Sequence, residues 1–307
     1  MSAVPQATAP APSAPAARRR GRVRATLRGS NWQLTTGTIV IGIIILAAVL
    51  APWIAPYPPQ ETDLTNVLAP PSAAHLAGTD GIGRDMLSRL MYGARISLTV
   101  SGLGMICSIL IGIGTGMLAV FGGRTSEITV LRLIDVQLAF PYILLAIAIT
   151  SAVEPSVTVL ILLMALAGWA GAARVVRSVA LQERQKDYVL AAELVGADRV
   201  RIARRYVFPS VRPSVLVLAP LQMSAMIVFE ATLSFLGMGV KPPTPTWGGM
   251  MLEGKVYMST AWWMTVLPGL CIFITASALI LIGEGLQRKT GQKIDVFSGT
   301  VKRDEDA

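Results

Sequence analysis

Long apolar segments alternate with polar, mostly basic connections along this chain of 307 residues. A helix needs about 20 mainly apolar residues to cross a bilayer, and six segments approach or exceed that length. They are residues 36–55, 96–121, 128–152, 156–176, 214–236 and 262–283. We therefore expect an all-α integral membrane protein with six transmembrane helices. Their even number would place both termini on the same side of the membrane.

The overall composition is typical of a membrane protein. Hydrophobic residues make up 53% of the chain, charged residues only 15%, and the mean hydropathy is +0.58, whereas soluble domains have about 25% charged residues. The formal net charge is +9. Because the basic residues lie beside apolar segments and no aromatic side chains are interleaved with them, we expect contact with membrane lipid and no nucleic-acid binding.

The distribution of lysine and arginine predicts the orientation of the chain in the membrane. Basic residues are concentrated in the N-terminal tail, after the second segment, in the loop before the fifth segment and at the C-terminus. The connections on the other side contain only Arg84, Arg89, Arg95, Lys241 and Lys255. Both termini and the loop at 187–209 are therefore expected in the cytoplasm.

These expectations divide the chain into five regions. We expect a disordered basic cytoplasmic tail over residues 1–30 and a first transmembrane helix over 31–56. An extracytoplasmic loop with an amphipathic helix follows over 57–95. Residues 96–285 form a core of five helices that includes the cytoplasmic hairpin 187–209, and residues 286–307 form a second cytoplasmic tail.

The hairpin 187–209 has the start and stop signals of two short helices. Asp187 is expected to cap the first helix, and Gly196 provides a residue that tolerates positive φ where this helix ends. Asp198 is expected to cap the second helix and Pro209 to end it. Helical spacing predicts one apolar face on each helix, formed by Tyr188, Ala191, Ala192 and Val195 on the first and by Val200, Ala203 and Val207 on the second. A solvated basic loop is the alternative interpretation.

The residues of the chain do not form a known catalytic constellation. The sequence has no GxxxxGK[ST] phosphate loop, no HExxH and no GxSxG motif. Its single histidine, His75, has no cysteine nearby, and Cys107 and Cys271 both lie within apolar runs. We therefore expect a protein that is not an enzyme, with no metal site, no cofactor and no disulfide.

Two carboxylates, Asp135 and Glu230, fall within the apolar segments. Placing a carboxylate inside the bilayer costs free energy, so such a residue is a candidate for the translocation path. Arg132 lies one turn from Asp135, so an ion pair between them explains Asp135 as well. Two further function classes stay open on this basis: a proton-coupled secondary carrier that uses both carboxylates, and a membrane scaffold or receptor.

The hairpin resembles the coupling segment of ABC importer permeases, whose usual pattern is Glu-Ala-Ala, three residues, Gly, nine residues, Ile-x-Leu-Pro. The matching positions are Ala191, Ala192, Gly196, Phe208 and Pro209. The chain departs from this pattern at Leu190, where glutamate is usual, and at Tyr206, where isoleucine is usual.

Two further segments resemble the C-type permeases of dipeptide, oligopeptide and nickel importers. Residues 75–100 carry Asp80, Arg84 and Asp85 at the matching positions, and Asp85 is also placed to cap a helix that runs into the membrane. Residues 230–250 match the fifth span and the loop after it, which includes Trp247. The usual Asp-Pro ending of the C-terminus is absent.

This resemblance implies a type I ABC importer permease of the bacterial plasma (inner) membrane, with peptides as the expected cargo. Its partners would be a homologous B-type permease, two cytoplasmic ABC ATPases and an extracytoplasmic substrate-binding protein. The extracytoplasmic contacts would involve Asp80, Arg84, Asp85 and Trp247. Coupling to the ATPases would involve Tyr188, Ala191, Ala192, Gly196, Asp198, Tyr206, Phe208 and Pro209.

Overall fold

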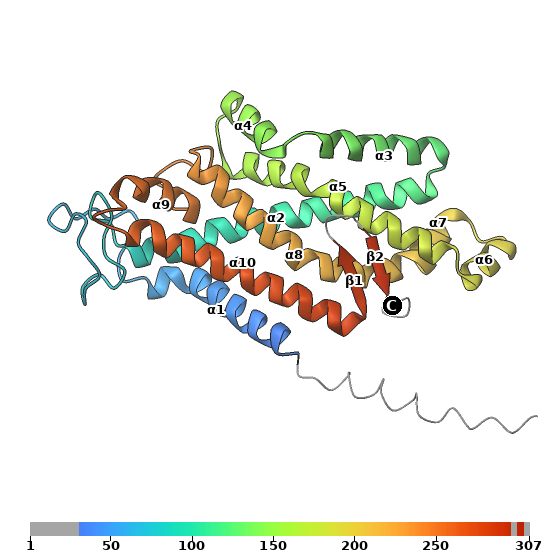
Figure 1. Ribbon diagram of the computed structural model, residues 1–307, viewed down its shortest axis with the longest axis horizontal. Coiled ribbons are helices and arrows are strands. Elements are labelled where there is room, and N and C mark those ends of the chain that lie inside the picture. The colour runs from blue at the N-terminus through green and yellow to red at the C-terminus, as the bar shows by residue number, and fades with distance from the viewer. Residues whose placement is uncertain (1–30, 296–299, 304–307) are drawn as a thin grey trace, which may run out of the picture.

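The computed structural model describes residues 31–295 and 300–303, so the expected tail 1–30 and part of the expected tail 286–307 lie outside the described residues. Within them, long helices form an elongated bundle (Figure 1). Five helices or continuous helical stretches are long and apolar enough to cross a membrane. They contain α1 (Trp32–Ile54), α2 (Met86–Phe121), α5 (Val157–Arg184), α8 (Phe208–Phe235) and α10 (Trp263–Thr290).

The remaining apolar segment is broken into two helices. α3 (Arg124–Ala139) and α4 (Tyr142–Ala152) meet at an angle of 83°, so the continuous helix expected over 128–152 is wrong. The break falls at Phe140, which is extended with ψ of 135°, and at Pro141. Proline lacks an N–H and disfavours helical geometry in the residue before it. Counted as one bent span, the pair brings the number of spans to six.

α2 and α5 pack against each other through small residues. A Cβ atom built on Gly112 would lie 2.4 Å from the Cβ of Ala172, and one built on Gly116 would lie 2.8 Å from the carbonyl oxygen of Ala173. Gly104 approaches Met164 equally closely, at 2.3 Å. Small residues at such positions let two helix backbones approach, which is a main source of helix association in membranes.

α1 lies along α10 at the edge of the bundle. A Cβ on Gly37 would lie 2.6 Å from the Ala278 carbonyl oxygen, and Gln33 Nε2 donates a hydrogen bond of 2.9 Å to Glu284. α10 ends at Gly291, whose φ is +63°. A short antiparallel strand pair follows, β1 (Gln292–Asp295) with β2 (Thr300–Arg303), and adds a small sheet to an otherwise helical fold.

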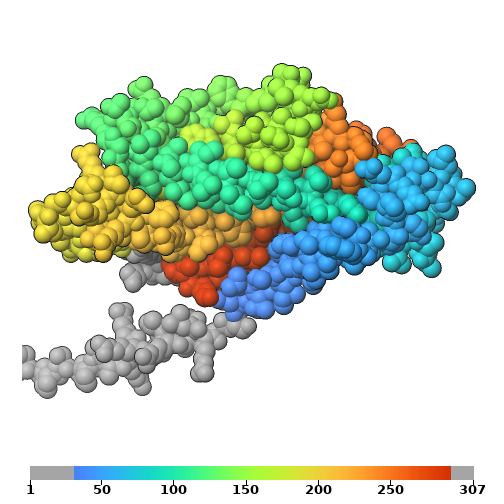
Figure 2. Space-filling view, turned by 180° about the vertical axis from the view of Figure 1, so that it is seen from behind, coloured from blue at the N-terminus to red at the C-terminus, as the bar shows by residue number. Residues whose placement is uncertain are grey.

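The connections gather at the two ends of the bundle. α6 (Asp187–Leu194), α7 (Arg199–Ile202) and the π-helical turn η2 (Ala203–Val207) lie at one end. The loop before α2, α9 (Trp247–Gly254) and the 3₁₀ turn η3 (Lys255–Tyr257) lie at the other. Figure 2 shows this separation from the opposite side, with the hairpin in yellow and the loop before α2 in light blue.

We expect the substitution Gly112→Ala to destabilise the chain by about 1–3 kcal/mol, because the added methyl group overpacks the contact with Ala172. Gly114→Ala is the matched control, since a Cβ there meets no atom within 4 Å. Thermal unfolding of the purified chain in detergent measures both. Equal melting temperatures for the two variants would contradict the close contact.

Candidate functional site

The hairpin 187–209 differs from its expected start and end. Lys186, not Asp187, occupies the N-cap position of α6, and no side chain caps this helix. Pro209 does not end the second helix, because η2 leads directly into α8 and Pro209 lies in the first turn of α8. The helix continues past this proline after a π-helical turn, in which the Phe208 N–H donates to the Ala203 carbonyl oxygen.

Two expected features of the hairpin are present. Gly196 takes a φ of +87° at the turn between the helices, where the N–H of Ala197 donates to the carbonyl oxygen of Ala192 at 3.0 Å. Asp198 caps α7, with its Oδ1 accepting a hydrogen bond of 3.2 Å from the Arg201 N–H. These local bonds give the hairpin a defined geometry between its two helices.

The hairpin is packed firmly onto the ends of α5 and α8. Its buried side chains are Val189, Ala192, Ile202 and Val207, and all of them except Ala192 join a core cluster with residues of α2, α5 and α8. The expected faces are therefore only partly right: Ala192 and Val207 are buried, whereas Tyr188, Ala191, Val195 and Val200 are exposed. The face of α6 that is buried is formed by Val189 and Ala192, and it differs from the face that helical spacing predicted.

A buried carboxylate fixes the start of the hairpin. Glu183, near the end of α5, accepts a hydrogen bond from the hydroxyl of Tyr188 and forms an ion pair of 2.8 Å with Lys186 Nζ. The ring of Tyr188 in turn lies 6.3 Å from that of Tyr206 in η2. The first arm of the hairpin is thus tied to α5, and the ring contact links the second arm to the first.

The free side of the hairpin carries an apolar surface that we name the tip patch. It consists of Tyr188, Leu190, Leu194, Val195 and Val200. Leu194 is 91% exposed, Val195 87% and Val200 61%. Leu190, which stands where the resemblance expects glutamate, is also exposed and enlarges the patch. Arg199, Arg201, Arg204 and Arg205 of the same hairpin are exposed as well, and exposed apolar side chains accompanied by polar ones are typical of a protein contact.

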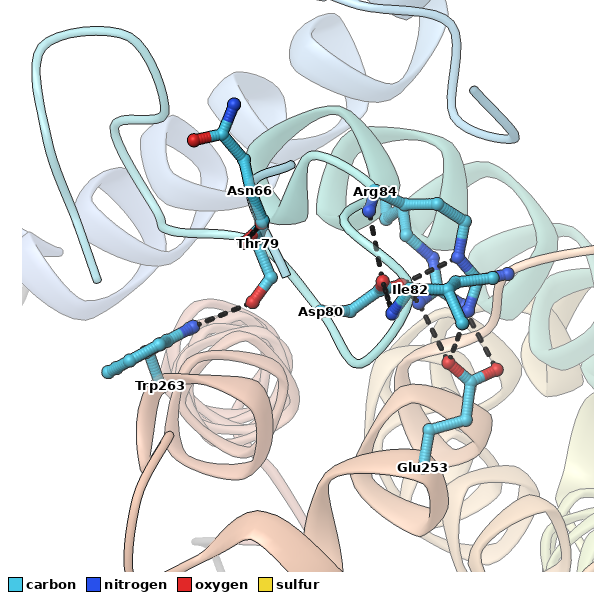
Figure 3. A network of polar contacts seen from close by, with 8 residues as sticks. Asn66, Thr79, Asp80, Ile82, Arg84, Glu253 and Trp263 are labelled. Carbon is cyan, nitrogen blue, oxygen red and sulfur yellow. Dashed lines mark hydrogen bonds and ion pairs between the residues drawn. The ribbon is translucent and has the colours of Figure 1, made fainter. Parts of the chain in front are cut away.

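At the other end of the bundle, four charged side chains form a charge cluster (Figure 3). Arg84 Nε contacts Asp80 Oδ2 at 2.6 Å and Arg84 Nη2 contacts Glu253 at 2.8 Å, while Arg89 Nη1 pairs with Asp80 and lies 2.7 Å from Glu253. Asp80 and Arg89 are buried. The two positive charges balance the two negative charges, and the ion pairs join the loop before α2 to α9.

Asp85 and Trp247 lie beside this cluster. Asp85 caps α2 by accepting a hydrogen bond of 2.8 Å from the Ser88 N–H, and its other oxygen lies 3.0 Å from His75 Nδ1. Trp247 is buried, and its indole N–H donates to the Leu90 carbonyl oxygen at 3.0 Å. A second indole, that of Trp263, donates to the Thr79 carbonyl oxygen (Figure 3).

The structure therefore brings Asp80, Arg84, Asp85 and Trp247 to one end of the molecule. It adds Glu253, which sequence reasoning missed, because nothing in the local pattern around α9 pairs this glutamate with arginines more than 160 residues earlier.

Asp135 and Glu230 occupy two different environments. Asp135 is paired with Arg174 Nη2 at 3.2 Å and its side chain is 70% exposed, so the expected ion pair with Arg132 is wrong. Glu230 is completely buried and accepts a hydrogen bond of 2.7 Å from Ser234 Oγ. Among the hydrogen bonds and ion pairs of the described residues, the two carboxylates share no partner.

Comparison with known proteins gives consistent matches. Residues 108–296 match the family described as binding-protein-dependent transport system inner membrane component, and residues 31–71 match the N-terminal TM domain of oligopeptide transport permease C. The chain is 38% identical to the di/tripeptide transport system permease protein DppC of Pseudomonas aeruginosa, covering 84% of this chain and 87% of that protein. It is also 38% identical to the dipeptide transport system permease protein DppC of Escherichia coli, covering 86% and 90%.

A solved structure of the MetNI methionine ABC transporter in inward-facing conformations has a similar fold. The match covers 66% of this chain and 97% of the MetNI chain, with a TM-score of 0.53 and 16% sequence identity. At this identity the likeness concerns the arrangement of helices alone.

We expect Arg89→Met to destabilise the chain by about 3–5 kcal/mol, because it leaves the buried Asp80 carboxylate without its closest cation. Lys241→Met is the matched control, since Lys241 pairs with Glu154 at 2.7 Å on the surface and such pairs contribute little. Unfolding of both variants in detergent measures the difference. A loss in the control as large as in Arg89→Met would contradict the structural role of the charge cluster.

Proposed function

Because the chain belongs to the family of binding-protein-dependent transport system inner membrane components, we propose that it is the C-type permease of an ATP-driven importer of short peptides. The observation that carries this proposal is the tip patch: apolar side chains exposed on a hairpin that is itself packed firmly onto two bundle helices. The peptide cargo rests on the named relatives, of which two are permeases of di/tripeptide and dipeptide systems.

In the proposed assembly, one of two cytoplasmic ATPases covers the tip patch. The patch would supply apolar contact area. The positive charges of the exposed hairpin residues Arg199, Arg201, Arg204 and Arg205 would attract the ATPase and fix its position on the hairpin. Closure of the ATPases would displace the hairpin, and the links from Glu183 to Lys186 and Tyr188 would pass this displacement to α5. Gly196 and Asp198 keep the two arms in fixed relation during this movement.

The opposite end of the bundle would face a substrate-binding protein outside the cytoplasm. The charge cluster and the cap at Asp85 hold the loop before α2 against α9, so this end offers a rigid surface. A homologous B-type permease would complete the translocation path. Both termini and the hairpin would then lie in the cytoplasm of a bacterium, with the bundle in its inner membrane.

A proton-coupled carrier has less support from the geometry. Such a carrier needs carboxylates that protons can reach from both sides of the membrane in turn. Asp135 is paired with an arginine in an exposed position, and Glu230 is sealed among helices with a serine as its donor. We therefore do not assign proton coupling to either residue.

We expect Leu194→Asp to weaken binding of the ATPase subunits at least tenfold. Burial of a leucine contributes about 1.5–3 kcal/mol, and the variant also places a charge in the contact. Leu64→Asp is the control, because Leu64 is similarly exposed in the loop at the other end of the molecule. Co-purification of the ATPases with the permease measures binding, and an unchanged yield with Leu194→Asp would refute the docking site.

We expect uptake of a labelled dipeptide to require this chain together with its ATPases and binding protein, and to stop when the ATPases carry a substitution in their phosphate loop. Proteoliposomes with ATP enclosed and no proton gradient measure this directly. Uptake by this chain alone, driven by an imposed proton gradient, would establish the secondary carrier instead.

A further inference from the structure

An apolar groove of about 260 Å³ lies on the side of the bundle, between α1, α2 and α10. Its walls include Ile43 and Ala47 of α1, Met91 and Ala94 of α2, and Ile274 of α10. Ile43 and Ile274 are also exposed, so the groove opens toward the surroundings of the bundle. Because α1 lies at the edge of the bundle, these surroundings are membrane lipid.

Two tryptophans indicate the depth of this groove in the membrane. Trp32 and Trp53 are exposed near the two ends of α1, about 32 Å apart at 1.5 Å per residue. This distance is close to the thickness of about 30 Å of the hydrocarbon core, and tryptophans are enriched at both of its surfaces. Ala47 and Ile43 follow at about 9 and 15 Å from Trp53 along α1. The groove therefore lies at the depth of lipid acyl chains, in the leaflet on the side of the charge cluster.

An exposed arginine borders the α2 wall of the groove. Arg95 directly follows Ala94 and lies one turn from Met91 on the same helix. None of the ion pairs between the described residues includes Arg95. A cation in a membrane-spanning helix costs free energy unless it is paired or reaches the membrane surface. A negative charge from outside these residues is therefore expected near Arg95.

The guanidinium group of Arg95 is directed toward the membrane surface. Its Cζ lies 5.9 Å from the centre of the Tyr92 ring, and Tyr92 is nearly one turn closer to the Asp85 cap at the start of α2. Arginine side chains near a membrane surface extend in this way toward the lipid headgroups. Arg95 is thus placed to contact a headgroup above the groove, while the groove accommodates an acyl chain of the same lipid.

We propose that an anionic phospholipid binds at this place, with one acyl chain in the groove and with phosphate oxygens that accept hydrogen bonds from the Arg95 guanidinium. The planar guanidinium suits bidentate contact with a phosphate. A zwitterionic lipid carries its own ammonium group beside the phosphate, so an anionic lipid offers Arg95 the stronger counter-charge. With both termini in the cytoplasm, as proposed, this lipid belongs to the outer leaflet. It would fill the space between α1 and α2 and hold the edge helix on the bundle.

The test uses the purified full chain in detergent and two photoreactive lipids, phosphatidylglycerol and phosphatidylethanolamine, each with a diazirine in one acyl chain. Mass spectrometry identifies the labelled residues after illumination at increasing lipid concentration. We expect saturable labelling of the groove residues Ile43 and Ile274, with half-saturation at a concentration at least fivefold lower for phosphatidylglycerol. Labelling that rises linearly with either lipid and does not saturate would reveal only general contact with lipid and would refute the site.

A variant of the arginine tests the phosphate contact. We expect Arg95→Gln to raise the half-saturation concentration of phosphatidylglycerol at least fivefold and to remove the preference over phosphatidylethanolamine, because a hydrogen bond between two charged groups is lost. Arg212→Gln is the matched control, since Arg212 is also exposed and lies over an aromatic ring, that of Phe208, at the other end of the bundle. An unchanged lipid preference in Arg95→Gln would overturn the proposal.

A variant of the groove tests the position of the acyl chain. Ala47→Phe places a ring in the groove and should reduce labelling by both lipids at least fivefold. Val49→Phe is the control, because Val49 is exposed on the nearly opposite face of α1 and does not line the groove. Equal labelling of the two variants would place the acyl chain elsewhere and contradict the site.

The same labelling of the chain together with the second permease distinguishes lipid from protein as the occupant. Retained labelling supports the lipid site. Its loss in the complex would assign the groove and Arg95 to the contact between the permeases and overturn the proposal. These measurements need no transport, so a failure of peptide uptake would contradict the proposed function and leave the lipid site unaffected.

Discussion

The close packing of α2 against α5 is the constraint on which the other features of this protein depend. Inside a membrane, helices gain little from the hydrophobic effect between them, and association relies on close approach of backbones at small residues. Gly104, Gly112 and Gly116 provide that approach along one face of α2. Because the two helices are held together over most of their length, features at both ends of the bundle are fixed relative to each other.

Each candidate functional feature is built onto one of these two helices. α2 starts at the Asp85 cap and contributes Arg89 to the charge cluster, so it anchors the loop end. α5 ends at Glu183 and Arg184, which hold α6, so it anchors the hairpin end. Between them, Ser108 from α2 and Gly168 from α5 position the Gln222 amide. One packed helix pair therefore connects the tip patch and the charge cluster.

Features with a local cause could be predicted from the sequence. The apolar segments, the turn at Gly196 and the caps at Asp85 and Asp198 follow from residues close together in the chain. Features decided by distant neighbours could not. Whether Pro209 ends a helix or starts one depends on how η2 continues into α8, and the pairing of Arg84 and Arg89 with Glu253 depends on where α9 lies. The bend at Pro141 had a local signal, but a proline alone does not tell a kink from a break.

α5 and α8, the two helices on which the hairpin is packed, differ in stiffness. α5 contains no proline from Val157 to Arg184, so its hydrogen-bond ladder is continuous past Gly168. α8 contains Pro213 and Pro220 within its helix, and each removes one backbone hydrogen bond from the part of α8 that leads from the hairpin to Gln222. A helix bends most readily at such positions. The hairpin is therefore packed on one helix with a continuous hydrogen-bond ladder and on a second helix that bends more readily.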